Sequence, residues 1–333
     1  GVSLKQLLNF SGQASVRKLS YKHGIFSLFN EGLMFKCRSV FSYISLSVSE
    51  GEDGKLIDIR PSKLIKFVSF SSFIFFNLAP LAVADDQVAA GSEKSSDFFD
   101  AALSDWDFSI GAGAGFGPDY EGSDEYGVGA MPILEASWLD DALFISLDRG
   151  IGATFLRSEH FSGGVSLNYD WGRDEGDNSA LKGLGDVDAG LAGTAFAELD
   201  LGMYALGLDV TQDLSGEDKG LLASLNAEYR HSFLDERLWI SAGPSVSWAS
   251  EDYMQSYFGV NSKQASRSKY NQHDADAGLK DVGFNLGATY SFDENWAMNG
   301  SLGYARLLGD AADSPFVESK NQFFGGLAVT YSF

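Results

Sequence analysis

The feature that most constrains the fold is an alternation of residue types with a period of two. In 280–292 the alternation places apolar residues on one face and Gly, Asn, Thr and Ser on the other. The stretches 165–171, 221–230 and 237–248 alternate in a similar way. Such alternation over about ten residues indicates β-strands with one apolar and one polar face. The sequence therefore predicts an all-β fold.

Two kinds of all-β protein produce this pattern, a soluble sandwich and a membrane barrel. The strands approach the ~9–11 residues of a tilted membrane strand, whereas strands of soluble proteins usually have ~5–6. The polar face is rich in Gly and Ser, which suits a narrow barrel interior. Aromatic residues lie near the strand ends, as in interfacial girdles: Tyr169, Trp171, Trp248, Tyr290 and Phe292. We therefore predict a transmembrane antiparallel up-and-down β-barrel over 105–333, in the outer membrane.

The connections between the predicted strands alternate in length. Short turns are expected at 139–141, 157–160, 200–202, 234–236 and 293–294. Long loops are expected at 117–126, 172–187, 250–279 and 309–321. Outer-membrane barrels have short periplasmic turns and longer outer loops. A plain count gives eleven strands, and a tight outer turn at 148–150 that divides 142–156 gives about twelve, with ten as the alternative.

The C-terminal end of the chain alternates in the same way and finishes on an aromatic residue. Tyr331 and Phe333 share the face that Leu327 and Val329 begin. This end resembles the C-terminal signature that the barrel-assembly machinery recognises in bacterial outer-membrane proteins. We therefore interpret Tyr331 and Phe333 as an assembly signal.

Residues 63–84 follow the pattern of a secretory signal peptide. Lys63 and Lys66 precede an apolar run at 67–78, and Ala82 and Ala84 provide small residues before Asp85. Cleavage is expected between Ala84 and Asp85. The alternative, a membrane anchor, would need a run of ~20 apolar residues. Residues 85–104 would then form a leader in the periplasm.

The charge distribution separates the first 84 residues from the rest. They hold ten Lys/Arg and five Asp/Glu of 24 and 46 in the chain, which leaves 14 and 41 to the remainder. The net charges are therefore +5 and −27. Such asymmetry is typical of a targeting segment. Because signal peptides begin close to their positive region, we interpret 1–62 as an upstream extension from a mis-assigned start.

The acidic part offers little for chemistry. Its negative charge argues against nucleic-acid binding, and it has no cysteine because Cys37 lies upstream. Of its histidines, His160 and His231 flank predicted periplasmic turns, and His273 lies in an outer loop beside Asp274 and Asp276. A lone histidine in a loop is usually only solvated. We predict no enzyme, no cofactor and no metal site.

Five phrases in order carry a family resemblance. They are GPDYEGSD (117–124), WGRDEGDN (171–178), LKGLGDV (181–187), DYMQSYFG (252–259) and YARLLGDAADSP (304–315). With the terminal YSF they resemble the MltA-interacting protein family, also called MipA/OmpV, over about 105–333. The resemblance marks twelve loop residues: Pro118, Asp119, Tyr120, Glu121, Gly122, Arg173, Asp252, Tyr253, Asp310, Asp313, Ser314 and Pro315. Turn formation is the simpler explanation for most of them.

The resemblance implies a non-catalytic outer-membrane barrel. The founding member of the family is described as a scaffold that links a lytic murein transglycosylase to a peptidoglycan synthase, and other members as porin-like. We therefore expect a scaffold whose partners are these two enzymes, with a small porin-like diffusion channel as the alternative. Outer-membrane lipid, lipopolysaccharide and the barrel-assembly machinery are further expected partners.

Overall fold

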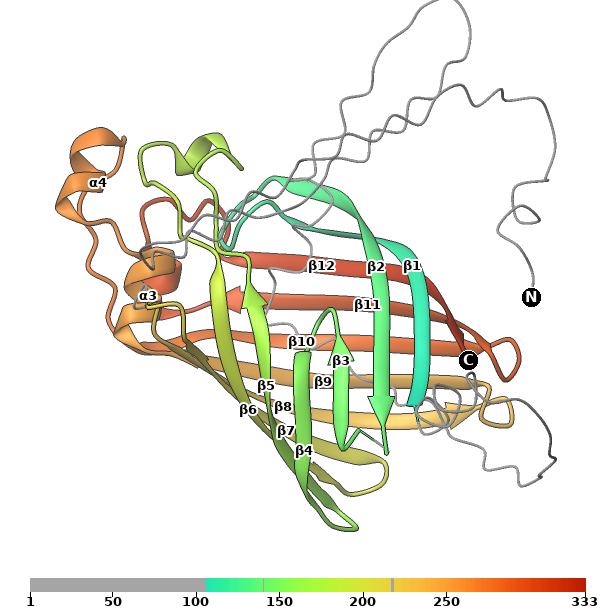
Figure 1. Ribbon diagram of the computed structural model, residues 1–333. Coiled ribbons are helices and arrows are strands. Elements are labelled where there is room, and N and C mark those ends of the chain that lie inside the picture. The colour runs from blue at the N-terminus through green and yellow to red at the C-terminus, as the bar shows by residue number, and fades with distance from the viewer. Residues whose placement is uncertain (1–105, 140, 217–218) are drawn as a thin grey trace, which may run out of the picture. The chain divides into compact units, whose positions relative to one another are not determined.

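The computed structural model describes residues 106–139, 141–216 and 219–333, which form one closed antiparallel barrel (Figure 1). Its strands are β1 (Trp106–Pro118), β2 (Tyr126–Trp138), β3 (Leu143–Ser146), β4 (Gly150–Arg157), β5 (Phe161–Asp170), β6 (Gly190–Asp200), β7 (Tyr204–Asp213), β8 (Leu221–Phe233), β9 (Leu238–Ala249), β10 (Gly278–Ser291), β11 (Trp296–Leu307) and β12 (Asn321–Ser332). Each pairs with its neighbours in the chain, and β1 pairs with β12. The predicted barrel and its twelve strands are confirmed, and the alternative of ten strands is wrong.

The predicted division of 142–156 into two strands is present. Its geometry explains why the apolar alternation shows no break there. Ser146 at the end of β3 pairs with Gly150 at the start of β4. Three residues separate this pair, so odd-numbered residues point outward on both sides of the turn. Gly150 has φ +77°, and a Cβ atom there would lie 2.0 Å from the backbone oxygen of Leu167. The turn therefore requires a glycine, although the apolar phase continues through it.

The five short turns are confirmed at one end of the barrel, and the four long loops at the other. The sequence missed a further outer loop between β7 and β8. The outer loops contain the helices η2 (Ser179–Leu181), α3 (Glu251–Phe258), α4 (Ser262–Arg267) and α5 (Gly309–Asp313). In the described part of the chain, no helix is long and apolar enough to cross a membrane.

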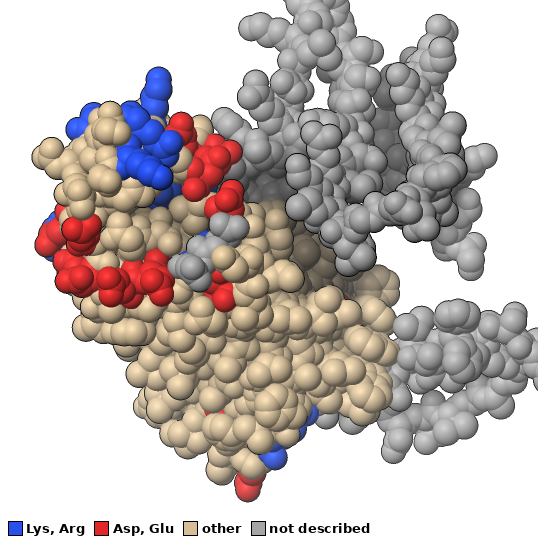
Figure 2. Space-filling model, turned by 60° about the vertical axis from the view of Figure 1, so that its left-hand side comes forward, with Lys and Arg blue, Asp and Glu red and all other residues tan. Residues whose placement is uncertain are grey.

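The apolar faces of the strands point outward. In β10, Leu286 is 45% exposed on the outer wall, whereas Asn285 is 7% exposed and faces the lumen. Figure 2 shows a broad wall free of Lys, Arg, Asp and Glu between charged ends. This is the surface of a barrel in lipid. A soluble sandwich would bury these residues.

The C-terminal aromatic residues lie at the end that carries the short turns. The ring of Tyr331 lies 4.9 Å from the ring of Trp296 and 4.9 Å from that of Phe333. Phe333 is largely exposed, and its N–H donates to the backbone oxygen of Phe108. These contacts form part of an aromatic girdle, and the role of Tyr331 and Phe333 in assembly stays a prediction.

One stretch of β2 lacks a strand partner on one side. Strand β2 pairs with β1 along its whole length but with β3 only over 135–138, because β3 has four residues. Over 126–133, no backbone partner lies on the β3 side of β2 among the described residues. We call this stretch the free edge of β2.

Arginine scanning on β10 tests the orientation of the wall. Leu286→Arg should lower the free energy of unfolding in lipid by about 2–4 kcal/mol, because a lipid-facing charge loses its hydration. Asn285→Arg should cost less, since the lumen is polar. Urea unfolding in lipid vesicles measures both, and the opposite ranking would mean that the barrel is inside out.

Proline substitution tests the free edge. Ala130→Pro should be tolerated, because the N–H of Ala130 points to the unpaired side. The matched control is Ala288→Pro in β10, a strand that pairs on both sides. It should destabilise the barrel by at least about 1 kcal/mol more, because a ladder hydrogen bond is lost in lipid. Equal losses at the two positions would show that β2 has no free edge.

Candidate functional site

Four outer loops pack against one another across the mouth of the barrel. They are 119–125, 171–189, 250–277 and 308–320, and we call them together the loop cap. Each contributes to one buried apolar cluster: Tyr120, Ala180, Leu181, Leu184, Val260 and Phe316. The hairpins β1–β2, β5–β6 and β9–β10 lie four strands apart in a barrel of twelve. Loops that start a third of the circumference apart can share a cluster only by crossing the mouth.

Phe316 lies at the centre of this cluster. Its backbone oxygen accepts a hydrogen bond of 2.8 Å from the hydroxyl of Tyr120. The guanidinium of Arg173 lies 5.0 Å from the centre of its ring and donates a hydrogen bond of 2.8 Å to the backbone oxygen of Tyr257. Burial lowers the pKa of Arg173 to about 10, so the group is still charged at neutral pH. One cation therefore joins its own loop to two others.

A second apolar cluster fixes the helices of the cap to the barrel. It joins residues of α3 and α5 to the outer ends of β8, β9 and β11: Leu222, Ala249, Met254, Phe258, Ala275, Leu307, Ala311 and Ala312. The hydroxyl of Ser314 donates a hydrogen bond of 2.6 Å to the backbone oxygen of Phe258. The cap is therefore packed as a small core of its own.

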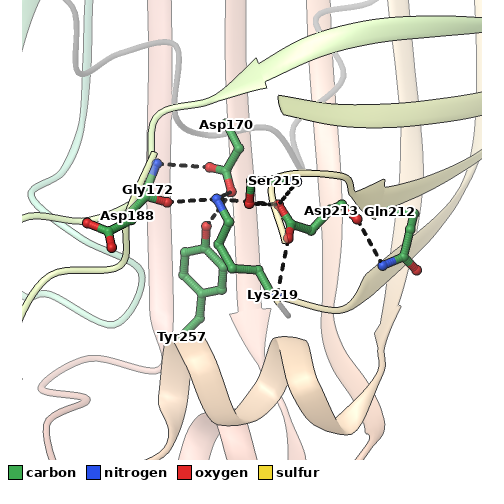
Figure 3. A network of polar contacts seen from close by, with 8 residues as sticks. All are labelled: Asp170, Gly172, Asp188, Gln212, Asp213, Ser215, Lys219 and Tyr257. Atoms are coloured by element: carbon green, nitrogen blue, oxygen red, sulfur yellow. Dashed lines mark hydrogen bonds and ion pairs between the residues drawn. The ribbon is translucent and has the colours of Figure 1, made fainter. Parts of the chain in front are cut away.

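A buried lysine joins three further parts of the outer end (Figure 3). The Nζ of Lys219 lies 2.8 Å from the Oδ2 of Asp170, 2.7 Å from the backbone oxygen of Asp188 and 3.7 Å from the Oδ1 of Asp213. The hydroxyl of Tyr257 donates to the same Oδ2 of Asp170 at 2.8 Å. Burial raises the pKa of Tyr257, which keeps this hydroxyl protonated. The network connects loop 214–220 and α3 to the end of β5.

Lys280 makes a comparable link on the other side of the mouth. A register shift between Leu279 and Asp281 turns Lys280 into the protein, where it is fully buried. Its Nζ lies 2.7 Å from the Oε1 of Glu121 and 2.6 Å from the Oδ2 of Asp281. A buried charge is tolerated only when it is paired in this way.

Most of the twelve loop residues named from the sequence are brought together in the cap. Besides Tyr120, Glu121, Arg173 and Ser314, described above, Asp119 accepts a hydrogen bond from Asn178, and Tyr253 stacks on Tyr257. Gly122 has φ +103°, and its backbone oxygen accepts from the N–H groups of residues 318 and 319. Their contacts hold loops together, which supports the structural interpretation.

The remaining loop residues lie at the edge of the cap. Asp310 accepts a hydrogen bond of 2.8 Å from the N–H of Asp276. Asp313 is exposed beside Lys320, whose hydrogen bond holds the pKa of Asp313 below its usual range. Asp252 and Pro315 are exposed, and Pro118 ends β1.

The three histidines among the described residues lie in different surroundings. His160 is exposed in a short turn, and His231 points outward between the rings of Tyr229 and Phe233. The Nε2 of His273 lies 3.0 Å from the backbone oxygen of Asp310. The predicted cleavage residues Ala82, Ala84 and Asp85 lie outside the described residues.

Sequence reasoning missed the residues that matter most to the cap. It selected charged and turn-forming residues from the five phrases, whereas Leu181, Leu184, Phe258 and Phe316 provide the buried core. The available signal was the presence of large apolar residues in loops that are otherwise polar. Lys219 was missed because its loop was not recognised.

The cap also contains a polar pocket of about 270 Å³. It is lined by Asp186, Val187, Asp188, Lys219, Gln255, Ser256, Asn261 and Gln264. The charge of Lys219 is already balanced by Asp170, so this pocket presents no free cation to a ligand.

Comparisons with known proteins agree with this description. The family model described as MltA-interacting protein MipA matches residues 110–333. Outer membrane protein Omp26La of Vibrio anguillarum is 30% identical over 166 residues, which are 48% of this chain and 61% of the relative. The MltA-interacting protein of Escherichia coli K12 is 25% identical over 236 residues, 68% of this chain and 90% of the relative. Among solved structures, the CymD monoaromatic hydrocarbon channel covers 68% of this chain and 88% of its own, at 14% identity and a TM-score of 0.36.

Removing the buried lysine should loosen the cap. Lys219→Met leaves Asp170 and Asp213 without their cation, so the loops should open more often, and proteases added outside intact cells should cut 250–277 at least about tenfold faster. Lys182→Met, at an exposed residue of loop 171–189, is the control and should leave cleavage of 250–277 unchanged. Equal cleavage of the two variants would show that the lysine network does not hold the cap.

Proposed function

This chain belongs to the MltA-interacting protein MipA family, and from that membership we propose that it is a scaffold for murein enzymes. It is a β-barrel of the outer membrane. The proposed activity is binding without turnover at the periplasmic end. The partner would be a lytic murein transglycosylase, with a peptidoglycan synthase as a second partner.

The proposed partner rests on the name of one relative. The Escherichia coli relative, of which this chain covers 90%, is named for an interaction with MltA. The chain spans about 61% of the length of the two Vibrio relatives, whose names state only an outer-membrane location. The identity of the partner in this protein is therefore part of the proposal.

The geometry of the outer end favours a scaffold over a diffusion channel. A channel needs a lumen that is open at both ends, whereas the loop cap crosses the outer mouth on a packed apolar cluster. A scaffold needs only a rigid barrel and a surface on the side where its partners are. The murein layer is on the periplasmic side, so the short turns become the candidate surface.

These turns expose apolar side chains at their tips. Leu139, Leu201, Met203 and Leu234 are all exposed, and Leu234 most of all, at 63%. Leu234, Asp235 and Glu236 also have φ of +56°, +53° and +66°. Three consecutive residues other than glycine in the left-handed region store strain, which is typical of functional surfaces. We take the turn 234–236 as the main contact of the partner.

The segment 85–104 is a second candidate for contact, although it lies outside the described residues. Its acidic, Ser-containing sequence precedes β1, whose first residues lie at the same end as the short turns. Contacts from this segment would add to the area that the partner covers.

Capture experiments test the scaffold proposal. Leu234→Glu should weaken capture of a purified lytic murein transglycosylase of the MltA type by at least about tenfold, as expected for a hot-spot residue. Leu214→Glu is the matched control, because Leu214 is 56% exposed in an outer loop and should not face the partner. Heat-modified migration on gels confirms that both barrels fold.

Deletion of 86–100 tests the leader separately. It leaves every described strand intact and should reduce capture further in the Leu234→Glu background. Unchanged capture after the deletion would make the leader a spacer only. If the intact protein captures no murein enzyme, the scaffold proposal is wrong for this chain.

A further inference from the structure

The free edge of β2 has a defined lower end in the barrel wall. The N–H of Leu147, in the β3–β4 turn, donates to the backbone oxygen of Leu134, which is the last bond on this side. Because N–H and C=O groups of alternate residues point to the same neighbour, the backbone groups of Val128, Ala130 and Pro132 also face this side. Val128 is accordingly 80% exposed.

The sequence agrees with the structure at this edge. Pro132 has no N–H, and its nitrogen falls on the unpaired side. Proline within a sheet is confined to edges and bulges, where its missing donor costs no ladder bond. Pro244 of β9 lies where two pairs are missing from the β8–β9 ladder, between Asn226↔Ser245 and Tyr229↔Ala242. At 132 a proline removes no ladder bond, because β2 has no strand partner on the β3 side there.

The interruption lies between β2 and the outer part of β5, above the β3–β4 turn. The β4–β5 ladder begins at Ile151↔Leu167, near the start of β4. Strand β5 extends to Asp170, so its outer part continues beyond β4. Both borders carry lipid-facing apolar side chains: Val128 and Leu134 on β2, Ile151 on β4, and Leu167 and Tyr169 on β5.

The lumen side of the same border has small or apolar residues. By alternation, β2 turns Gly127, Gly129, Met131 and Ile133 inward. The side chain of Met131 lies along the inner surface of β12, where a Cβ atom added to Gly326 would be 3.2 Å from its Cε. A hydrocarbon chain that entered from the lipid would meet no charged side chain of β2 until Glu135.

We propose that the free edge of β2 is a lateral portal, through which hydrocarbon chains from the outer leaflet reach the lumen. The loop cap crosses the outer mouth, so a side route is the remaining connection between the lumen and the outer leaflet. Unpaired backbone groups are costly in lipid, and a portal accounts for a stretch of wall that leaves them unpaired. This inference is independent of the scaffold proposal.

Strand addition by a partner protein is the main rival. It would use the same edge, since unpaired N–H and C=O groups form a template for another strand. Pro132 removes a donor from the middle of that template, which favours the portal. A partner strand would protect the amides of Val128 and Ala130 from hydrogen exchange by bonding to them. A hydrocarbon chain forms no hydrogen bonds and would leave them unpaired.

Lipid quenching of fluorescent labels tests the portal. In a Cys37→Ser background, bimane is attached at Met131→Cys on the lumen side of the free edge and the protein is placed in vesicles with nitroxide on the acyl chains. The lumen control is Ser245→Cys, which faces inward on β9, and the lipid control is Val128→Cys. Quenching at Met131→Cys should be several-fold stronger than at Ser245→Cys and approach that at Val128→Cys.

Two outcomes would overturn the proposal. One is quenching at Met131→Cys no stronger than at Ser245→Cys. The other is slow hydrogen exchange of the Val128 and Ala130 amides in the same vesicles, equal to that of the paired amides of β10, because this would mean that another strand covers the edge. If Met131→Cys fails to fold, Ile133→Cys reports on the same side of β2 and decides between these results.

Discussion

The structure depends on one constraint, which is that a backbone in lipid must satisfy its own hydrogen bonds. The pairing of β1 with β12 from Ser109 to Phe116 removes the two edges that an open sheet would have. Once the sheet is closed, each strand can place apolar residues in lipid and small or polar residues in the lumen. The free edge of β2 does not meet this constraint. Pro132 agrees with this, because proline has no N–H to pair on that side.

Charges are placed where water or a partner is available. Lys219, Lys280 and Arg173 are buried near the outer end of the barrel, and each has an acceptor within 2.8 Å. Asp170, Glu121 and Tyr257, one acceptor for each cation, come from other loops or strand ends, so each cation joins separate segments. Removing one member would leave a buried charge behind, which costs more than the pair itself contributes. The cap is therefore held both by its apolar clusters and by these cations.

The sequence predicted the barrel well because strand alternation is local. The stretch 280–292 shows both faces of β10 without any knowledge of its neighbours, and the short turns follow from the same pattern. The cap was not predictable in the same way, because its contacts join residues far apart in the chain, such as Tyr120 and Phe316. The Lys219 network was missed for a related reason: its loop, 214–220, is short and polar and carries no periodic signal.

We propose that the loop cap closes the outer mouth, so that the barrel serves as a scaffold and not as a pore. Single-channel recording of the purified barrel in a planar bilayer tests it most directly. We expect no steady conductance for the wild-type protein and a stable open level when Leu181→Ser and Phe316→Ser together remove the core of the cap. A steady conductance of the wild-type protein that these substitutions leave unchanged would contradict it.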